Sequence, residues 1–238
     1  HELKRSLELG ARSPLVGDVA ERFARMTGFD RVACSNTGTE AVMTAMRLAR
    51  AVTGRDTSVM FTHSYHGHSD GTLAAANPDG GTDAIAPGVP AGSVENILVL
   101  DYGSDAALET IRTLGPSLAA VTVEPVQSRN PSLQPAAFLK ELRSITEQSG
   151  TALIFDEMIT GFRVHPAGAQ GFFGVRADIA TYGKIIGGGL PLGVIAGTAH
   201  FMDGIDGGLW SYGDTSFPAA DRTAFGGTFC QYPLAMAA

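Results

Sequence analysis

The chain has 238 residues, of which 44% are hydrophobic and 17% charged, so it is long enough to bury a sizeable core. Its 17 lysines and arginines against 24 aspartates and glutamates give a net charge of −7, which argues against a nucleic-acid partner, and the absence of an apolar run of transmembrane length argues against a membrane partner. Cys34 and Cys230 are its only cysteines; they are too few for a disulfide scaffold and favour a cytoplasmic location.

Apolar periodicity and helix-forming residues predict the helices. Between Val16 and Met26 apolar residues recur close to helical spacing, and Gly28 ends the segment. Further helices are expected at residues 39–50, 106–114 and 135–148, the last with Pro135 in its first turn. The sequence starts at His1 without a methionine and closes on a helix-forming run at residues 234–238, so we expect a piece of a longer protein.

Strand-like stretches alternate with several of these helices. They lie at residues 31–34, 58–62, 96–100, 119–124, 152–156, 177–182 and 193–197. This alternation predicts one α/β unit with a mostly parallel seven-stranded sheet and helices on both faces. Residues 77–92 are rich in Gly, Pro and Asp and are expected to form a long surface loop.

Two charged residues end strand-like stretches, where open α/β sheets place their chemistry. Asp156 ends an apolar run, and Lys184 follows Ile179-Ala180-Thr181-Tyr182 and opens a glycine-rich stretch. A buried lysine that loses its proton can hold an aldehyde as a Schiff base, and a nearby carboxylate can keep a pyridine nitrogen protonated. This is the chemistry that pyridoxal 5'-phosphate requires. The alternatives are a solvated surface lysine and an aspartate that, with Glu157, simply starts a helix.

A polar loop, Ser35-Asn36-Thr37-Gly38-Thr39-Glu40, lies between a predicted strand and a predicted helix. Free backbone N–H groups and the helix dipole make such a place an anion site. Gly38 lets the backbone approach a phosphate, and Thr39 adds a hydroxyl. The alternative is a plain helix cap made by Thr37 or Thr39.

The densest polar cluster is His63-Ser64-Tyr65-His66-Gly67-His68-Ser69-Asp70-Gly71. Tyr65 could stack on a planar cofactor ring. His66-x-His68-x-Asp70 resembles the metal site of a binuclear hydrolase, although Gly71 stands where a further histidine is wanted. Gly67-x-Ser69-x-Gly71 matches the nucleophile elbow of serine hydrolases, with His165 and His200 downstream but without an evident motif. A loop of hydrogen-bonded histidines with no catalytic role is the fourth interpretation.

Six motifs occur in family order and resemble those of the class III aminotransferases, above all glutamate-1-semialdehyde aminomutase and its relatives. They are Asn36-Thr37-Gly38-Thr39-Glu40-Ala41, Tyr65-His66-Gly67-His68, Glu124-Pro125-Val126, residues 155–163, residues 183–191 and Gly227-Thr228-Phe229. The resemblance covers nearly the whole chain. It implies a fold type I, pyridoxal 5'-phosphate-binding large domain over residues 1–238, with the family's N-terminal segment and most of its C-terminal small domain missing.

The resemblance also implies a role for each matching position. Lys184 would bind the cofactor's aldehyde, Asp156 the pyridine nitrogen, and Gly38 and Thr39 the phosphate. Tyr65 and Met158 would pack on opposite faces of the ring. Thr228 would reach the phosphate of a neighbouring subunit, which implies a homodimer with shared active sites.

One departure from the aminomutase pattern points to a particular substrate. Gln127-Ser128-Arg129 stands where the aminomutase tends to have Ala-Gly-Asn. This stretch, with residues 210–214 and 227–230, resembles aminotransferase domains of hybrid polyketide–nonribosomal peptide synthetases. Those domains aminate a β-keto thioester on an acyl carrier protein. The expected reaction is therefore amino transfer from an amino donor to a carbonyl acceptor, with an intramolecular aminomutase, the two hydrolases and an inert scaffold as alternatives.

Overall fold

A computed structural model describes residues 13–210, 213–216 and 222–238. Its α-helices are α1 (Leu15–Thr27), α2 (Gly38–Thr53), α3 (Asp105–Leu114), α4 (Ala136–Ser149), α5 (Gly168–Phe173), α6 (Ala199–Met202) and α7 (Pro233–Ala237). Its strands are β1 (Arg31–Ser35), β2 (Thr57–Phe61), β3 (Ala74–Ala76), β4 (Thr82–Ala84), β5 (Ile97–Leu100), β6 (Leu118–Val123), β7 (Ala152–Asp156), β8 (Ile179–Tyr182) and β9 (Gly193–Gly197). Short 3₁₀ turns lie at η2 (Asp70–Thr72), η3 (Ala91–Ser93), η4 (Gly115–Ser117) and η5 (Lys184–Gly187). In the part of the chain that these ranges cover, no helix is both long and apolar enough to cross a bilayer.

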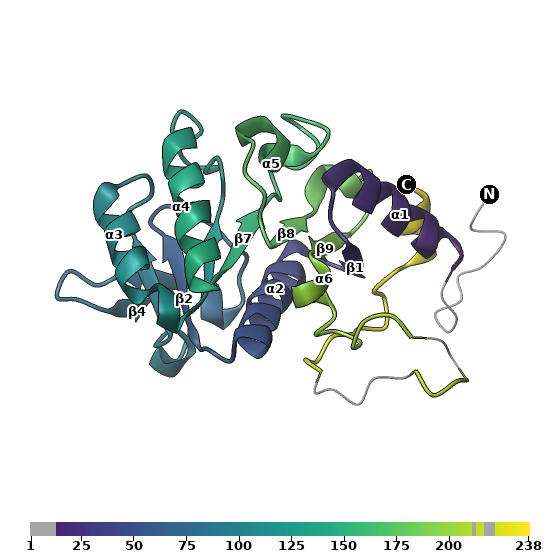
Figure 1. The fold of residues 1–238 in the computed structure, drawn as a ribbon, viewed down its shortest axis with the longest axis horizontal. Helices are drawn as coiled ribbons and strands as arrows, with labels where there is room; N and C mark the ends of the chain where they lie inside the picture. The colour runs from purple at the N-terminus through teal and green to yellow at the C-terminus, as the bar shows by residue number, and fades with distance from the viewer. Residues whose placement is uncertain (1–12, 211–212, 217–221) are drawn as a thin grey trace.

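Seven strands form one sheet in the order β1-β9-β8-β7-β6-β2-β5, which confirms the predicted seven-stranded, mostly parallel sheet (Figure 1). The pairs β2/β5, β2/β6, β6/β7 and β7/β8 are parallel. Strand β9 runs antiparallel to both of its neighbours, β1 and β8. No α-helix lies between β8 and β9, and a short connection of this kind suits antiparallel neighbours.

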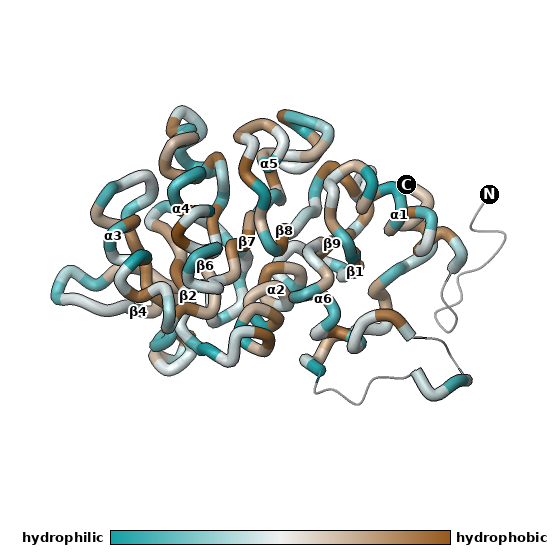
Figure 2. The backbone as a smooth tube through the Cα atoms, viewed as in Figure 1, coloured by the Kyte–Doolittle hydropathy of each residue, from teal (hydrophilic) through white to brown (hydrophobic). Residues whose placement is uncertain are grey.

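The sheet has a hydrophobic core on each face. One core joins the sheet to α1, α3, α4, α5 and α7, and the other joins it to α2 and α6. Successive strand residues point to opposite faces, so Leu153 and Phe155 enter the first core and Ile154 enters the second. Because both faces are covered, the central strands read as continuous apolar runs, and Figure 2 shows their hydrophobic colour in the middle of the molecule.

Helix and loop boundaries differ from prediction in a few places. Gly28 ends α1 in the left-handed conformation, as expected for a C-cap glycine. Pro135 is the N-cap of α4 rather than part of its first turn. The expected surface loop at residues 77–92 is partly wrong, because β4 lies within it and pairs antiparallel with β3. Gly80 and Gly81, both with positive φ, form the turn that lets these strands meet.

Candidate active site

A cavity of about 200 Å³ opens where the ends of β7 and β8 meet the start of α2. It is lined by Gly38, Thr39, Val42, Tyr65, His66, Gly67, Glu124, Ser128, Asp156, Met158, Ile159 and Lys184. Six of the seven residues predicted from sequence are therefore together in this wall. The seventh, Thr228, is not part of it. The cavity lies at the carboxyl ends of the parallel strands, where open α/β sheets bind ligands.

Asp156 is the last residue of β7 and its side chain is buried. One carboxylate oxygen, Oδ2, lies 2.8 Å from Nδ1 of His66, and the other, Oδ1, accepts a hydrogen bond from the backbone N–H of Met158 at 3.1 Å. A buried carboxylate with one bond to each oxygen has a defined orientation. It can present a negative charge to a ring nitrogen in the cavity.

His66 is the functional residue whose partner the sequence interpretation missed. The sequence offers it as a metal ligand, but its Nδ1 faces Asp156, and its Nε2 is buried without a hydrogen-bond partner among the described residues. The sequence signal for a role of His66 at the site is that it directly follows Tyr65, which is itself a candidate site residue. In the folded chain both residues line the cavity, and His66 also reaches the Asp156 carboxylate.

The start of α2 both caps the helix and leaves an anion site. Thr37 accepts a hydrogen bond from the Glu40 amide, and the Glu40 carboxylate accepts bonds from the amides of Asn36 and Thr37, which completes a capping box. The amides of Gly38 and Thr39 have no acceptor among the described residues. The cap and the anion site are thus compatible, because they use different N–H groups.

Two glycines allow close packing around this helix start. A Cβ on Gly38 would lie 2.8 Å from Sδ of Met158, so only glycine fits without displacing that side chain. Gly67 has φ of +90°, and a Cβ there would lie 2.6 Å from the Thr39 hydroxyl. The adjacent His68 amide donates to the same hydroxyl at 3.3 Å. The loop that carries Tyr65 is therefore anchored on α2.

Tyr65 and Met158 differ in exposure. Met158 is buried, with 9% of its surface accessible, whereas Tyr65 is 49% exposed at the rim of the cavity. The Tyr65 amide donates to Oε2 of Glu124 at 2.9 Å. An apolar side chain on one side and an aromatic ring at the rim can enclose a flat ligand.

Lys184 lines the cavity, but the expectation that it is buried is wrong: it is exposed. The apolar strand that precedes Lys184 is buried, and burial continues only as far as Gly183, after which the chain enters the 3₁₀ turn η5. Lys184 has φ of +51°, a value that non-glycine residues seldom adopt. Such backbone strain concentrates at functional sites. The turn directs a primary amine to the same cavity that Asp156 faces.

A buried network joins the strand ends that carry Asp156 and Lys184. The Glu157 carboxylate accepts hydrogen bonds from the Thr160 hydroxyl and from the amides of Ala169 and Gln170 at the start of α5. The Gln170 side chain donates to the Tyr182 hydroxyl at 3.2 Å. Burial raises the pKa of Glu157 above its ordinary value, against the lowering effect of these hydrogen bonds.

The two hydrolase interpretations do not match the geometry. Ser69 lies at the start of a 3₁₀ turn and its hydroxyl pairs with that of Thr72 at 3.2 Å, with no histidine bonded to it among the described residues. His66 is turned toward Asp156, away from a pairing with His68 and Asp70. Across the described ranges, no group of three or more His, Cys, Asp or Glu side chains could hold a metal ion.

Thr228 lies on an exposed turn outside the cavity. The turn approaches the start of α2, because Nδ2 of the Asn36 side chain donates to Sγ of Cys230 at 3.9 Å. The predicted contact of Thr228 with a second subunit stays a prediction. Of the other stretch used for the substrate prediction, Ser211 and Tyr212 lie outside the described residues.

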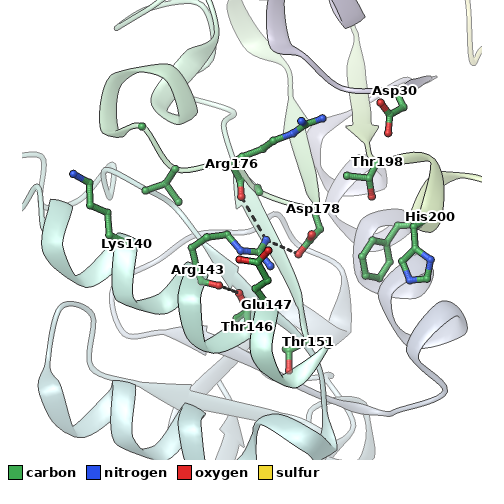
Figure 3. Close-up of a pocket in the computed structure, with 15 residues that line it drawn as sticks. Asp30, Lys140, Arg143, Thr146, Glu147, Thr151, Arg176, Asp178, Thr198 and His200 are labelled. Atoms are coloured by element: carbon green, nitrogen blue, oxygen red, sulfur yellow. Dashed lines mark hydrogen bonds and ion pairs between the residues drawn. The ribbon is translucent and has the colours of Figure 1, made fainter.

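A larger hollow, about 730 Å³, lies beside α4 and the amino ends of β7 and β8, opposite the carboxyl ends where the first cavity opens (Figure 3). Two of its charged side chains form an ion pair: Arg143 of α4 lies 2.8 Å from Asp178, whose carboxylate also accepts a hydrogen bond from the Leu153 amide at 2.8 Å. Arg176 donates to the backbone carbonyl of Gly28. The Arg143–Asp178 pair holds α4 against the sheet. The Asp30 carboxylate already accepts a hydrogen bond from the Ala199 amide at the start of α6, at 2.9 Å.

The family model for aminotransferase class III matches residues 10–238. The chain belongs to the class III aminotransferases. Glutamate-1-semialdehyde 2,1-aminomutase of Dichelobacter nodosus is 43% identical over 204 residues, which are 84% of this chain and 48% of that protein. The chain therefore spans about half the length of the curated relatives it matches.

Solved structures of a transaminase and an aminomutase share the fold. An omega-transaminase from Sphaerobacter thermophilus is 32% identical with a TM-score of 0.86, and covers 99% of this chain and 54% of its own. A glutamate-1-semialdehyde aminomutase from Pseudomonas aeruginosa is 26% identical with a TM-score of 0.83, covering 99% and 52%. The α/β fold with a mostly parallel sheet and flanking helices is thus the one predicted.

Proposed function

We propose that this protein is a pyridoxal 5'-phosphate-dependent enzyme that transfers an amino group. The observation that carries the proposal is the single cavity that gathers Asp156, Lys184 and the free amides of Gly38 and Thr39. The donors and acceptors fit each part of this cofactor: amides for a phosphate, a carboxylate for a ring nitrogen and an amine for an aldehyde. Residues 1–238 are, in this proposal, its large cofactor-binding domain.

Each residue then has a defined task. Gly38 and Thr39 bind the phosphate at the positive end of α2. Asp156 holds a proton on the ring nitrogen, and His66 holds Asp156. Bound pyridoxal 5'-phosphate supplies a conjugated ring that takes up negative charge when the donor loses its α-proton.

Lys184 has two tasks in the same proposal. Its amine binds the aldehyde until the amino donor displaces it. The freed amine would then be the base that accepts a proton from the donor's α-carbon and the acid that returns it at C4' of the bound cofactor. The exposed position of Lys184 at the cavity wall suits both tasks, because the donor must reach the same carbon that the lysine leaves.

The reaction that the relatives favour is the intramolecular shift of an amino group on glutamate 1-semialdehyde. The relative from Dichelobacter nodosus and one from Lysinibacillus sphaericus, 45% identical over 183 residues, both carry the aminomutase name. The wider proposal, transfer from an amino donor to a separate carbonyl acceptor, is supported by the similarity to the omega-transaminase.

A second candidate acceptor is a β-keto thioester bound to an acyl carrier protein. The observation that favours it is where the departure from the aminomutase pattern, Gln127-Ser128-Arg129, lies. Ser128 lines the cavity, and Gln127 is buried, with its side-chain amide donating to the Thr62 carbonyl at 2.7 Å. The full-length protein should be given either glutamate 1-semialdehyde or the carrier-bound β-keto thioester with amino donors. Mass spectrometry of the products decides between the two.

The general proposal has a direct test on purified protein loaded with pyridoxal 5'-phosphate. A band near the blue end of the visible, removed by borohydride, is expected, with the cofactor then fixed to the peptide that contains Lys184. Lys184→Ala should lose the fixed cofactor and all amino transfer, yet keep part of the cofactor affinity through the phosphate and ring contacts. Lys140→Ala, at an exposed position of α4, is the matched control and should behave as the parent. Parent-like turnover by Lys184→Ala would refute the proposal.

A further inference from the structure

Glu124 places a second buried carboxylate in the wall of the cavity, and no task above uses it. It directly follows β6 and is only 4% exposed. Its Oε2 accepts a hydrogen bond from the Tyr65 amide at 2.9 Å, and its Oε1 accepts one from the Ser128 amide at 3.3 Å. Each carboxylate oxygen therefore has its own backbone donor, from a different loop.

This pairing requires a carboxylate. An ionised carboxyl group is an acceptor at both oxygens, whereas a glutamine would present an NH₂ group to one of the two amides. Among the ion pairs of the described residues, none involves Glu124. Its charge is therefore stabilised by hydrogen bonds from backbone N–H groups, which are stronger than bonds between neutral groups.

The surroundings of Glu124 are rigid. The Tyr102 hydroxyl is buried and donates to the Pro125 carbonyl at 2.8 Å. Burial, and then the charge of Glu124, raise the pKa of Tyr102, so this hydroxyl remains a donor. The turn after Glu124 is closed by the Asn130 amide, which donates to the Gln127 carbonyl at 3.0 Å.

Apart from the bond between its amide and Glu124, few contacts fix the position of Tyr65. Its ring is half exposed and makes no hydrogen bond or aromatic contact with another described residue. Its neighbour His66 is fixed to Asp156 in the cavity wall. The bond from the Tyr65 amide to Glu124 is the contact that sets where the base of this side chain sits.

We propose that Glu124 is a positioning residue that holds Tyr65 over the cavity, so that the tyrosine ring can cover the flat face of the bound cofactor. This rests on the proposed function and adds a residue to it. Glu124 acts through Tyr65 and not by contact with the cofactor. Loss of the carboxylate should therefore matter only while residue 65 carries an aromatic ring.

The first test is a double-mutant cycle on pyridoxal 5'-phosphate affinity, measured by absorbance titration of the full-length protein. Glu124→Gln should weaken binding about tenfold, the loss expected for one strong hydrogen bond. In a Tyr65→Leu background the same change should alter affinity by less than about twofold, because coupled residues are non-additive. Equal losses in both backgrounds, or no loss in either, would overturn the proposal. Glu95→Gln, at an exposed site, controls for removal of one negative charge.

The second test needs no cofactor, and so separates this proposal from the proposed function. Hydrogen–deuterium exchange of the cofactor-free protein, read on peptides spanning residues 62–69, should show a protected Tyr65 amide in the parent and faster exchange in Glu124→Gln. The Glu95→Gln control should match the parent. If the parent fails to bind pyridoxal 5'-phosphate, the proposed function fails and this exchange pattern still decides the role of Glu124. Equal exchange in parent and Glu124→Gln would refute it.

Discussion

Nδ1 of His66 lies 2.8 Å from Oδ2 of Asp156, and only 1% and 2% of these two side chains are exposed. The two residues are 90 positions apart in the sequence. With the Met158 amide on its other oxygen, the Asp156 carboxylate is held from both sides before any ligand arrives. A carboxylate that is fixed in advance stabilises charge developing in the cavity better than one that must reorient, so Asp156 gains from this preorganisation.

Replacing His66 should therefore cost stability even without a cofactor. His66→Leu leaves one oxygen of a buried carboxylate unpaired, and we expect the unfolding free energy to fall by about 1–3 kcal/mol. Urea unfolding of the cofactor-free protein measures this. His66→Asn retains a donor and should recover part of the loss. His68→Leu, two positions away and exposed, should stay within about 0.5 kcal/mol of the parent. A parent-like His66→Leu would show that the pair contributes nothing.

Gly67 should tolerate alanine less well than a glycine of similar conformation elsewhere. Gly67 and Gly80 have φ of +90° and +98°, but a Cβ on Gly67 would lie 2.9 Å from the Thr39 Cα while Gly80 has nothing within 4 Å. Both alanine variants carry the backbone cost of about 1–2 kcal/mol. Gly67→Ala should lose a further ~1–3 kcal/mol through overpacking, and should bind pyridoxal 5'-phosphate more weakly because Thr39 shifts. Equal thermal stability of the two variants would contradict this.

The pKa of Glu157 predicts a pH dependence of stability. Burial raises it above the ordinary value of 4.5, so between that pH and the higher folded-state pKa the folded protein keeps a proton that the unfolded chain has released. The unfolding free energy of the parent should then fall as pH rises through this window. Glu157→Gln lacks the titration, so its stability relative to the parent should rise with pH over the same range.

The measurement for Glu157 is urea unfolding of parent and variant at a series of pH values from 4 to 8. Glu147→Gln, at an exposed site on α4, controls for the loss of one negative charge. A stability difference between Glu157→Gln and parent that is constant with pH, or that changes in the opposite direction, would show that burial does not dominate at this carboxyl group.

The homodimer that the family resemblance implies predicts complementation between two damaged chains. If Thr228 of one subunit binds the phosphate in the other subunit's site, Lys184→Ala and Thr228→Ala full-length proteins should form a mixed dimer with one intact site. That site should bind pyridoxal 5'-phosphate about tenfold more tightly than Thr228→Ala alone, the value of one charge-assisted hydrogen bond. Subunit exchange is confirmed by mass. Exchange without recovery of affinity would place Thr228 outside the neighbouring site.

The central strands were predictable because both faces of the sheet are covered, so each strand is an apolar run that stands out from its surroundings. Asp156 and Lys184 were predictable for a related reason: a charged residue directly after such a run lies at the carboxyl edge of the sheet. The capping box at Thr37 and Glu40 is likewise a local pattern with a local cause.

What the sequence by itself determined is therefore the set of strands in the seven-stranded sheet, the edge at which the chemistry gathers and the residue types available there, but not the β3–β4 hairpin. Only the tertiary structure decided the antiparallel direction of β9 and the exposed position of Lys184. It alone also decided the hydrogen bond between His66 and Asp156 and the one from the Tyr65 amide to Glu124. The physical reason is that the first group follows from short-range periodicity and burial, whereas the second depends on which distant segments become neighbours. A hydrogen bond between residues far apart in the sequence leaves no spacing to read, and it exists only once the sheet order has brought the loops together.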